Sequence, residues 1–540
     1  DLGGMVDNPE RGDSYVPTTS AARYLPRVGH HVYNGSAWVN EGVLAESESR
    51  VNLITYSTPR GNWSPIGVAI PTVNSAVSPD GSKNATRVNE LATTSAHYIR
   101  TSDNGSVTSG VLYTLSAYVK ADTSTACQLL YSTTGFGAAH YANFDLSTGT
   151  VGYEAADVVA ATIQDVGNGW YRCSVTCAAT STTSFAPIGF IVFIDNDPTS
   201  VARVPSYAGD TATQMYIYGV QFEEGASQTS ASTPSSLIPT SGQQGTREAE
   251  SFTIPSANLP YPAPQSITGN VYSGTDPVNI TGAHTFTPTI ADDSSTKVVR
   301  VKWTQTLNSG TRTRMRFRNA ANSADVLIRY YNGSGTFEEI IVTSTGLLWL
   351  QIENAVDVDI SGITLEEINP LSVSIGMEGR MTYADTGSTP ETEWYRWYLN
   401  SSNNIGWDLS TITTRTGEVT FQQKASGVND FVNTGQTEFS PDILVPYNIA
   451  SRHGSTFVNG AVDGVALTAD TTPTALPDLS STDLDLAYDY MGTISEFRVW
   501  DKDLGDAGLV EATNPSLEPS LSLTFEGVGT NSFVVNNWSE

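Results

Sequence analysis

Short runs of alternating apolar and polar residues recur along the chain. In the run at 111–120, every second residue from Val111 to Val119 is apolar. A period of two is typical of a β-strand with one buried face. Similar strand-like runs lie at 170–175, 215–224, 372–375, 393–398 and 493–500. The pattern therefore predicts an all-β protein, with helix signals confined to 503–513.

The dipeptide Asn459-Gly460 stands inside the strand-rich stretch 455–462. Both central residues of a type I′ turn have positive φ, which Asn and Gly tolerate better than other residues. We therefore expect a hairpin turn at these two residues.

Repeats indicate that the chain is modular. Its 540 residues exceed what one core organises, and domains of roughly 100–200 residues predict three or four units. The segments 217–224 and 360–367 share their hydrophobic pattern, a Gly and a terminal pair of glutamates, so we interpret them as the last strands of two similar modules. A linker rich in Ser, Thr and Pro follows the first of them at 225–245.

A second, weaker repeat concerns the start of the chain. The segment 15–20, with Arg23 after it, is similar to 237–241, with Arg247 after it. Because the second segment follows a finished module, we expect another module before Asp1. Because the chain starts at Asp1 rather than Met, we also expect this sequence to be a portion of a longer or processed product.

Charge and hydropathy exclude some classes of partner. The formal net charge of -29 argues against nucleic acid, whose phosphates require a basic footprint, and against an anionic membrane. No apolar stretch approaches the roughly 18 residues of a membrane span. We expect no nucleic acid and no membrane insertion.

Cysteines are sparse, which favours a fold that depends on hydrophobic cores. Cys173 and Cys177 lie four positions apart on one predicted strand, about 13 Å from each other, which is too far for a disulfide. Cys127 could pair with either of them or stay reduced.

Four motifs in the first half of the chain resemble jelly-roll, carbohydrate-binding-module-like domains of phage structural proteins. These motifs lie at 78–82, 112–120, 169–175 and 218–225. The run at 48–57 resembles the start of such domains, where a short Arg-x-Asn-Leu segment precedes the first strand. The resemblance covers about 45–245 and implies a jelly roll and linker at 51–245.

The last third resembles the concanavalin A-like, laminin-G-like sandwich. The motifs that carry this resemblance are 457–460 and 492–501, and the segment 250–254 suits the early strand of that family. The resemblance implies tandem antiparallel β-sandwiches, jelly rolls plus a concanavalin A-like sandwich. The implied parts are an N-terminal arm or connector at 1–50, the sandwich at 246–266 plus 370–526, an inserted second jelly roll at 267–369 and a C-terminal tail at 527–540.

Enzymatic motifs are absent from the sequence. Glucanases of the concanavalin A-like group use a Glu-x-Asp-x-x-Glu strand whose alternate carboxylates act on one sugar, and this string does not occur. Asp483, Asp485 and Asp489 are spaced as a solvated strand face requires. No Gly-x-Ser-x-Gly elbow, zinc helix or phosphate loop occurs either, so we predict no catalytic residues.

Metal-binding candidates are confined to Asx-rich loops. Asp80, Asp195 and Asp197 could supply oxygen ligands to Ca²⁺. Such turns more often use the same side chains without metal. We expect no cofactor, with Ca²⁺ at these three residues as the alternative.

The run 312–318 is the most unusual part of this acidic chain. Alternation places four arginines on one strand face and Thr313, Met315 and Phe317 on the core side. The arginines are Arg312, Arg314, Arg316 and Arg318. Arg329 and Tyr331 could add an aromatic platform on a neighbouring strand. Because Arg grips carboxylates and phosphates, one hypothesis is an acidic-glycan site; the other is a face that is solvated or pairs with a neighbouring module or subunit.

Aromatic residues supply a second set of glycan-binding candidates. Tyr131, Phe136 and Tyr141 lie in a Gly-rich stretch, where an exposed site is expected. A further aromatic group is less promising, because alternation assigns about half of it to the core. That group is Trp394, Tyr395, Trp397, Tyr398 and Trp407.

The resemblances imply a bacteriophage virion structural protein, a tail or head fibre or spike at the virion surface. Its expected partners are other virion proteins and bacterial surface polysaccharide, and such appendages are usually homo-oligomers, most often trimers. Two alternatives remain: a capsid decoration or spacer protein without ligand, and a polysaccharide depolymerase.

Overall fold

The computed structural model describes residues 27–522 except 29, 34, 226–233, 251, 263–265, 267, 273–277, 287–289, 291–296, 320, 345–349, 354–356, 369–370, 384–391, 411–414, 416, 436, 440–441 and 514–520. Within these ranges the chain forms antiparallel sheets and only two short α-helices. The prediction of an all-β fold of tandem antiparallel sandwiches is confirmed.

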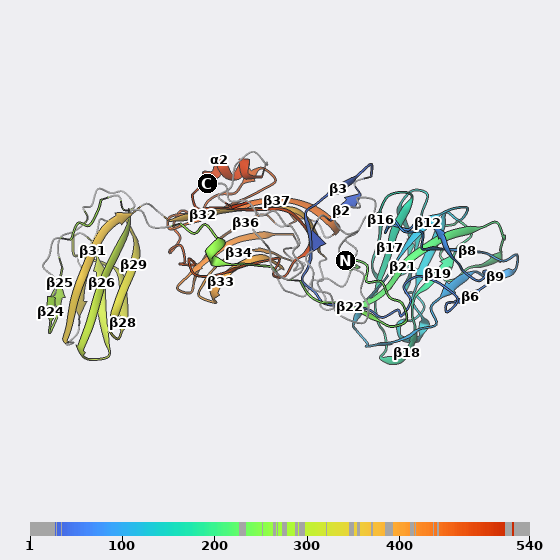
Figure 1. The fold of residues 1–540 in the computed structure, drawn as a ribbon, viewed down its shortest axis with the longest axis horizontal. Helices are drawn as coiled ribbons and strands as arrows, with labels where there is room; N and C mark the ends of the chain where they lie inside the picture. Colours follow the sequence, from blue (N-terminus) through green and yellow to red (C-terminus); the bar gives the residue numbers. More distant parts are fainter. Residues whose placement is uncertain are drawn as a thin grey trace.

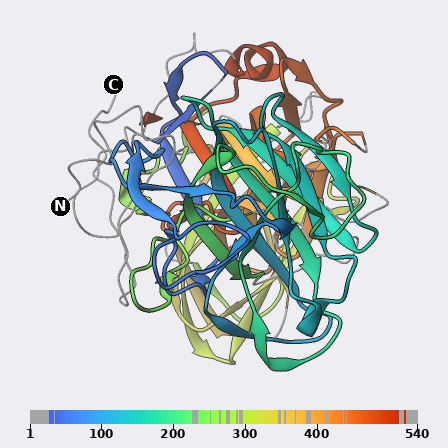
Figure 2. The ribbon, with the colours of Figure 1, turned by 90° about the vertical axis from the view of Figure 1, so that its right-hand side faces the viewer.

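Three sandwiches follow one another along the long axis of the molecule (Figure 1). The first module (residues 51–245) and the second module (residues 278–368) occupy opposite ends, and a central sandwich lies between them. Seen along the axis from the first module, the three parts overlap (Figure 2). The molecule is therefore elongated, with a separate core in each part.

The central sandwich packs an eight-stranded sheet on a six-stranded sheet. The larger sheet contains, in spatial order, β1 (Arg27–Val28), β4 (Val43–Glu46), β41 (Met491–Trp500), β32 (Ser372–Tyr383), β37 (Asp442–Gly454), β38 (Val458–Val462) and β39 (Val465–Ala466), with β42 (Leu521–Ser522) paired to β41. The smaller sheet contains β23 (Phe252–Ile254), β40 (Leu484–Leu486), β33 (Thr392–Asn400), β34 (Asn403–Leu409), β35 (Val419–Ala425) and β36 (Val428–Asn433).

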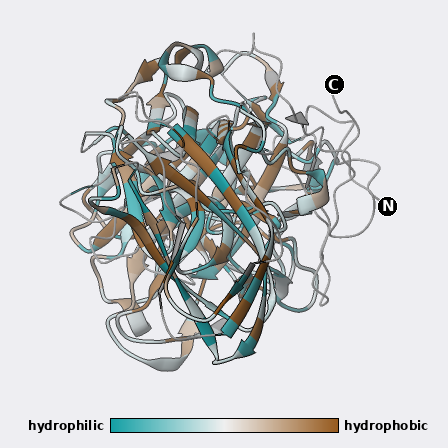
Figure 3. Cartoon of the chain, turned by 90° about the vertical axis from the view of Figure 1, so that its left-hand side faces the viewer, coloured by the Kyte–Doolittle hydropathy of each residue, from teal (hydrophilic) through white to brown (hydrophobic). Residues whose placement is uncertain are grey.

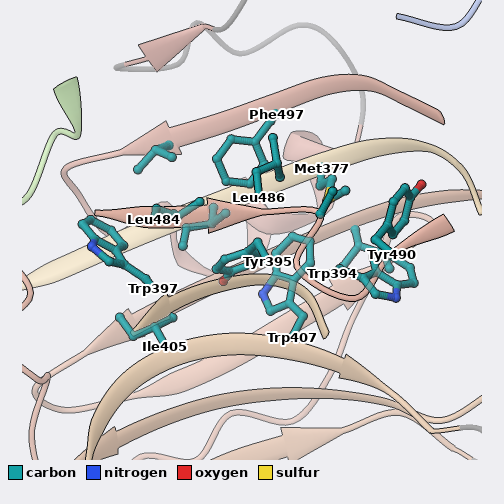
Figure 4. Close-up of a cluster of buried hydrophobic side chains, with 14 of the residues drawn as sticks. Met377, Trp394, Tyr395, Trp397, Ile405, Trp407, Leu484, Leu486, Tyr490 and Phe497 are labelled. Carbon is teal, nitrogen blue, oxygen red and sulfur yellow. The ribbon is translucent and has the colours of Figure 1, made fainter. Parts of the chain in front are cut away.

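Aromatic side chains fill the space between these two sheets (Figure 4). Trp394, Tyr395 and Trp397 of β33 and Trp407 of β34 are all at most 1% exposed. The Tyr395 ring lies 5.8 Å from the ring of Phe497 on the facing sheet. Large buried rings of this kind contribute most of the hydrophobic stabilisation of a sandwich.

Helix α2 (Gly505–Ala512) lies within 503–513, where the sequence predicts a helix. Leu509 of this helix packs with Ala450 and Ala461 on the outer side of the eight-stranded sheet. Arg452 of β37 holds the helix from the side through ion pairs with Asp503 and Asp506.

The prediction of a hairpin turn at Asn459-Gly460 is wrong. Both residues lie inside β38, and the turn that follows this strand is Asp463-Gly464, whose φ values are 46° and 82°. Gly460 is instead required by packing, because a side chain there would overlap the ring of Phe421.

The interpretation of 1–50 as an arm or connector is also wrong for its last part. Residues of β4 pair with β41 from Val43↔Ile494 to Glu46↔Met491. Val43 and Ala45 are fully buried in the core of the central sandwich. A four-residue strand is too short for its pattern to stand out in the sequence.

The first module is a sandwich of two six-stranded sheets. One contains β15 (Thr150–Glu154), β14 (Tyr141–Asp145), β13 (Ala126–Leu130), β19 (Phe190–Phe193), β10 (Tyr98–Arg100) and β6 (Ser64–Ile66). The other contains β16 (Val158–Asp165), β17 (Trp170–Ala178), β12 (Leu112–Ala121), β21 (Gln214–Glu224), β8 (Ala85–Asn89) and β7 (Thr72–Ala76).

The predicted linker at 225–245 is packed onto this module in its described part. Leu237 joins a buried cluster with Tyr118 and Tyr218. The side-chain amide of Asn52 donates to the Ile238 carbonyl at 2.9 Å. This segment is therefore part of the module rather than a free connection.

The second module is smaller, and its described residues form two four-stranded sheets. One contains β24 (Val278–Ile280), β31 (Asp357–Ile368), β26 (Lys297–Ser309) and β29 (Gly335–Thr343). The other contains β25 (His284–Thr285), β30 (Leu350–Glu353), β27 (Arg312–Arg318) and β28 (Asp325–Asn332). Figure 3 faces this end and shows hydrophilic and hydrophobic stretches alternating along its strands.

The central sandwich is interrupted twice in the sequence. The chain leaves it after β4, forms the first module and returns at β23; it leaves again after β23, forms the second module and returns at β32. The sequence predicted only the second interruption. Each end module is therefore joined to the centre by two passes of the chain.

A buried ion pair joins the two passes beside the first module. The strand β5 (Arg50–Asn52) pairs with β22 (Gly245–Arg247), and Arg247 Nη1 lies 3.1 Å from Glu46 Oε2, with both side chains at most 5% exposed. The same carboxylate accepts from the amide and the hydroxyl of Ser236, at 2.7 and 2.6 Å. The described chain thus compensates the Glu46 charge where water is excluded.

Cys127, Cys173 and Cys177 are all buried free thiols in the first module. Burial raises the pKa of the Cys173 thiol well above its usual value. The alternative of a disulfide from Cys127 is therefore not observed.

None of the helices in the described part of the chain has the length and apolar character to cross a bilayer.

Breaking the buried pair of Glu46 and Arg247 should destabilise the connection between the central sandwich and the first module. The variant Arg247→Met removes the cation that faces the buried Glu46 carboxylate, so we expect a loss of about 3 kcal/mol in unfolding free energy and faster proteolytic cleavage between the first module and the centre. The surface pair Lys302–Glu338, at 3.8 Å and about half exposed, supplies the control, and Lys302→Met should cost under about 1 kcal/mol. Equal effects of the two variants in urea unfolding would contradict this account.

Acid should destabilise the central sandwich through His453. Burial lowers the pKa of this imidazole from 6.5 to about 3, and its Nε2 lies 2.8 Å from Ser451 Oγ. Between these two pH values the unfolded chain binds a proton that the folded chain does not. The free energy of unfolding therefore decreases as the pH is lowered, by up to about 1.4 kcal/mol per pH unit. Urea unfolding followed by Trp fluorescence should lose less stability from pH 7 to pH 5 in His453→Gln than in the unchanged protein.

Candidate functional site

Strand β27 places its arginines on the outer face of the second module, as predicted. Thr313, Met315 and Phe317 alternate with them and are fully buried in the module core. The arginine face consists of Arg312, Arg314, Arg316, Arg318 and, on the neighbouring strand, Tyr330. It is a basic surface on an acidic protein.

One carboxylate neutralises part of this face. Asp325 accepts from Arg316 Nε and Nη2 at 2.8 and 2.7 Å, and Arg318 Nε lies 3.3 Å from the same carboxylate. The hydrogen bonds from Arg316 hold the pKa of the Asp325 carboxyl below its usual value. These two arginines therefore pair with a carboxylate of their own module.

The other half of the face combines a cation with an aromatic ring. Arg312 is exposed, and its guanidinium lies 4.5 Å from the centre of the Tyr330 ring, which is 50% exposed. In the strand register Tyr330 stands opposite Arg314, so the three side chains share one face. Arginine and aromatic groups together can bind a carboxylated sugar through both its charge and its ring face.

The predicted platform at Tyr331 is wrong. Tyr331 is only 8% exposed, its hydroxyl donates to Glu339 Oε1 at 2.7 Å, and its ring lies 4.8 Å from the ring of Trp303. Its partner in the register is Thr313, on the core side. Arg329 faces the same side at the sheet edge, 4.0 Å from Glu339. Tyr330, which the sequence analysis missed, is the exposed ring.

The basic residues of β26 do not belong to this face. Arg300 and Lys302 lie on β26 in the opposite sheet. Arg300 Nε donates to Glu366 Oε1 at 2.8 Å, and Lys302 Nζ lies 3.8 Å from Glu338. They do not extend the arginine face.

The aromatic site predicted in the Gly-rich stretch is also wrong. Tyr131, Phe136 and Tyr141 are at most 5% exposed. The Tyr131 hydroxyl lies 2.6 Å from the carbonyl oxygens of both Tyr113 and Val175, which places it inside the sandwich. The glycines allow the backbone to turn there rather than open a surface.

Among the aromatic residues of β33 and β34, Tyr398 alone reaches the surface. It is 37% exposed, whereas the four other candidates of that group are buried. The Arg396 guanidinium lies 4.5 Å from the Tyr398 ring centre and 3.5 Å from that of Tyr488. These rings already pack against a cation of the protein itself.

The three predicted calcium ligands serve loop structure. Asp80 accepts from the Ser78 hydroxyl and the Ser82 amide at 2.8 and 2.7 Å, and from Asn84 and Tyr218 at 2.8 Å. Asp197 accepts from the amide and hydroxyl of Thr199, and Asp195 has a φ of 53°. In the described residues no group of three or more His, Cys, Asp or Glu side chains is arranged to hold a metal.

Comparison with known proteins leaves the family open. No family model and no curated protein matches the sequence. Three solved structures are similar in part. They are a heptameric SAP-like pentraxin from Limulus polyphemus (7% identity, 42% of this chain, 93% of that chain, TM-score 0.22), the mouse laminin alpha1 domains LG4-5 (10%, 42%, 92%, 0.19) and the tandem CBM22 domains of Paenibacillus barcinonensis Xyn10C (11%, 60%, 98%, 0.19). At these TM-scores the similarities support no assignment of a site.

Removing the Asp325 carboxylate should strengthen binding of polyanions to the arginine face. In Asp325→Asn, Arg316 and Arg318 lose their ionic partner, so we expect tighter binding to dextran sulfate, with a steeper dependence on salt. Microscale thermophoresis at two salt concentrations measures both effects. Asp122→Asn, which removes one charge from the first module, is the control, and an equal gain in both variants would show a net-charge effect only.

Proposed function

We propose that this chain is a non-enzymatic structural component of a bacteriophage particle, a tail or head fibre or spike, whose second module binds acidic polysaccharide on the bacterial surface. The observation that carries the proposal is the arginine face, with Arg312 and Tyr330 side by side at one end of an elongated molecule. In this proposal the protein acts at the virion surface, bound to other virion proteins, and as a homo-oligomer.

The arrangement of the modules supports a binding role. Each end module is held by two chain passes and extends away from the central sandwich (Figure 1). The net charge of -29 repels acidic polymers from most of the surface, so a local basic face is the place where such a polymer is attracted. Attraction confined to one end would orient the molecule on the bacterial surface.

The carboxylate on the arginine face favours binding over catalysis. The carboxylate beside the arginines, Asp325, is held by Arg316 with a pKa below its usual value. A general acid requires a raised pKa instead. The competing proposal of a depolymerase predicts new reducing ends when the chain is incubated with capsular polysaccharide, and a reducing-sugar assay decides between the two.

A spacer or decoration protein without ligand is the other candidate. It is favoured by the pairing of Arg316 and Arg318 with Asp325, because internal pairing is also what a purely structural strand needs. The two candidates differ in what happens when Arg312 and Arg314, the half of the arginine face away from Asp325, are changed.

Reversing two charges on the arginine face should abolish attachment. We expect the double variant Arg312→Glu/Arg314→Glu to lose at least about tenfold in binding to cells that carry an acidic capsule, since each reversal replaces attraction by repulsion. The control Lys302→Glu/Lys83→Glu makes the same change in net charge on other surfaces and should bind like the unchanged protein. Equal binding by all three proteins in a fluorescent cell-binding assay would favour the spacer.

A further inference from the structure

A cleft of about 530 Å³ lies where the first module meets the central sandwich. Its lining comes from three places: β2 (His31–Tyr33), the strands β15 and β16 of the first module, and β32 of the central sandwich. The residues that matter for its chemistry are Tyr33, Thr150, Thr162, Gln164, Asp165 and Arg380. Its volume is in the range typical of small-molecule sites.

One wall of the cleft is the edge of a sheet. In the described part of its sheet, β16 pairs only with β17. Half of the backbone N–H and C=O groups of an edge strand point away from its neighbour and can bind a ligand. Thr162 and Gln164 add a hydroxyl and an amide on this wall, and Ile163 adds apolar surface.

The opposite wall contains an aromatic ring and a compensated charge. Tyr33 comes from β2, which pairs with β3 (Trp38–Asn40) in a short hairpin. Arg380 Nε lies 2.6 Å from Glu41 Oε1, and the arginine side chain remains 35% exposed. The Arg380 guanidinium is therefore partly accessible from the cleft, and Glu41 balances its charge.

The formal charges of the lining are one guanidinium, Arg380, and one carboxylate, Asp165. An anionic ligand would meet the Asp165 carboxylate and an arginine already paired with Glu41, so the cleft has no attraction for acidic polymers. A purely apolar ligand would bury the Gln164 amide without a hydrogen bond, which is costly, whereas the Thr162 hydroxyl already bonds to Ser174 Oγ. A ligand with many hydroxyls and apolar ring faces satisfies both kinds of surface.

We propose that this cleft binds a neutral oligosaccharide, between the edge strand β16 and the wall formed by Tyr33 and Arg380. The proposal rests on the proposed function of glycan binding, but it assigns a second site with a different ligand. The ligand contacts both the first module and the central sandwich, so its binding also holds these two parts together.

Two variants of the full chain test the proposal. Thr162→Trp fills the cleft, and Gln164→Ala removes one hydrogen-bonding side chain without filling it. Thr364→Trp and Gln422→Ala make the same changes at half-buried strand positions of the second module and of the central sandwich, outside the cleft. Circular dichroism establishes that each variant is folded, and Gln164→Ala keeps the test valid if Thr162→Trp does not fold.

Neutral oligosaccharides, from dextran, galactan and N-acetylhexosamine polymers, serve as probes in a glycan array followed by titration calorimetry. We expect the unchanged protein to bind at least one of them, Thr162→Trp to bind it at least about tenfold more weakly, and Gln164→Ala about fivefold more weakly. Both controls and Arg312→Glu/Arg314→Glu should bind it normally.

The outcomes separate the two proposals. If the chain binds acidic polysaccharide but no neutral probe, or if the cleft variants bind the neutral probe normally, the cleft proposal is wrong and the arginine face stands. If neutral binding depends on the cleft but acidic binding is absent, the arginine face is wrong. If no glycan binds, both are overturned.

Discussion

Glu46 and Arg247 face each other almost without water at the point where the chain leaves the central sandwich and returns to it. The pair lies where two connections run side by side, and Ser236 supplies two further hydrogen bonds to the same carboxylate. An isolated buried charge at this position would cost several kcal/mol, so neither residue tolerates the loss of the other. The interaction, together with the hydrogen bonds from Ser236, therefore ties a strand of the centre, β4, to the first module.

Much of the architecture follows from period-two patterns and could be predicted. The alternation along β27 correctly separated Phe317, in the core, from Arg316, on the surface. The repeated segments at 217–224 and 360–367 do form the ends of β21 and β31, the last strands of the two end modules. These predictions are correct for the same reason. In a strand with one buried face, apolar and polar residues alternate, so the sequence shows which side chains face the core.

The features that the sequence could not predict are those that depend on which strands and side chains become neighbours. Tyr330 and Tyr331 are adjacent in the sequence, and only the pairing of β27 with β28 decides that Tyr330 joins the arginines. Asn459-Gly460 has the composition of a turn, yet the need to seat the Phe421 ring places it inside a strand. Tyr131 lies near glycines, but three hydrogen bonds of its hydroxyl hold it in the core. Local signals of this kind are outweighed by tertiary packing.

The first interruption of the central sandwich begins and ends at neighbouring residues. Arg50 and Arg247 are direct partners in the register of β5 and β22, so the chain enters and leaves this module at adjacent points. A short turn that joins these two points would close the centre without altering the order of its strands. The same pair of points would accept a different domain whose own ends lie together. In such an exchange the first module would be replaced, while the central sandwich would keep all of its strands.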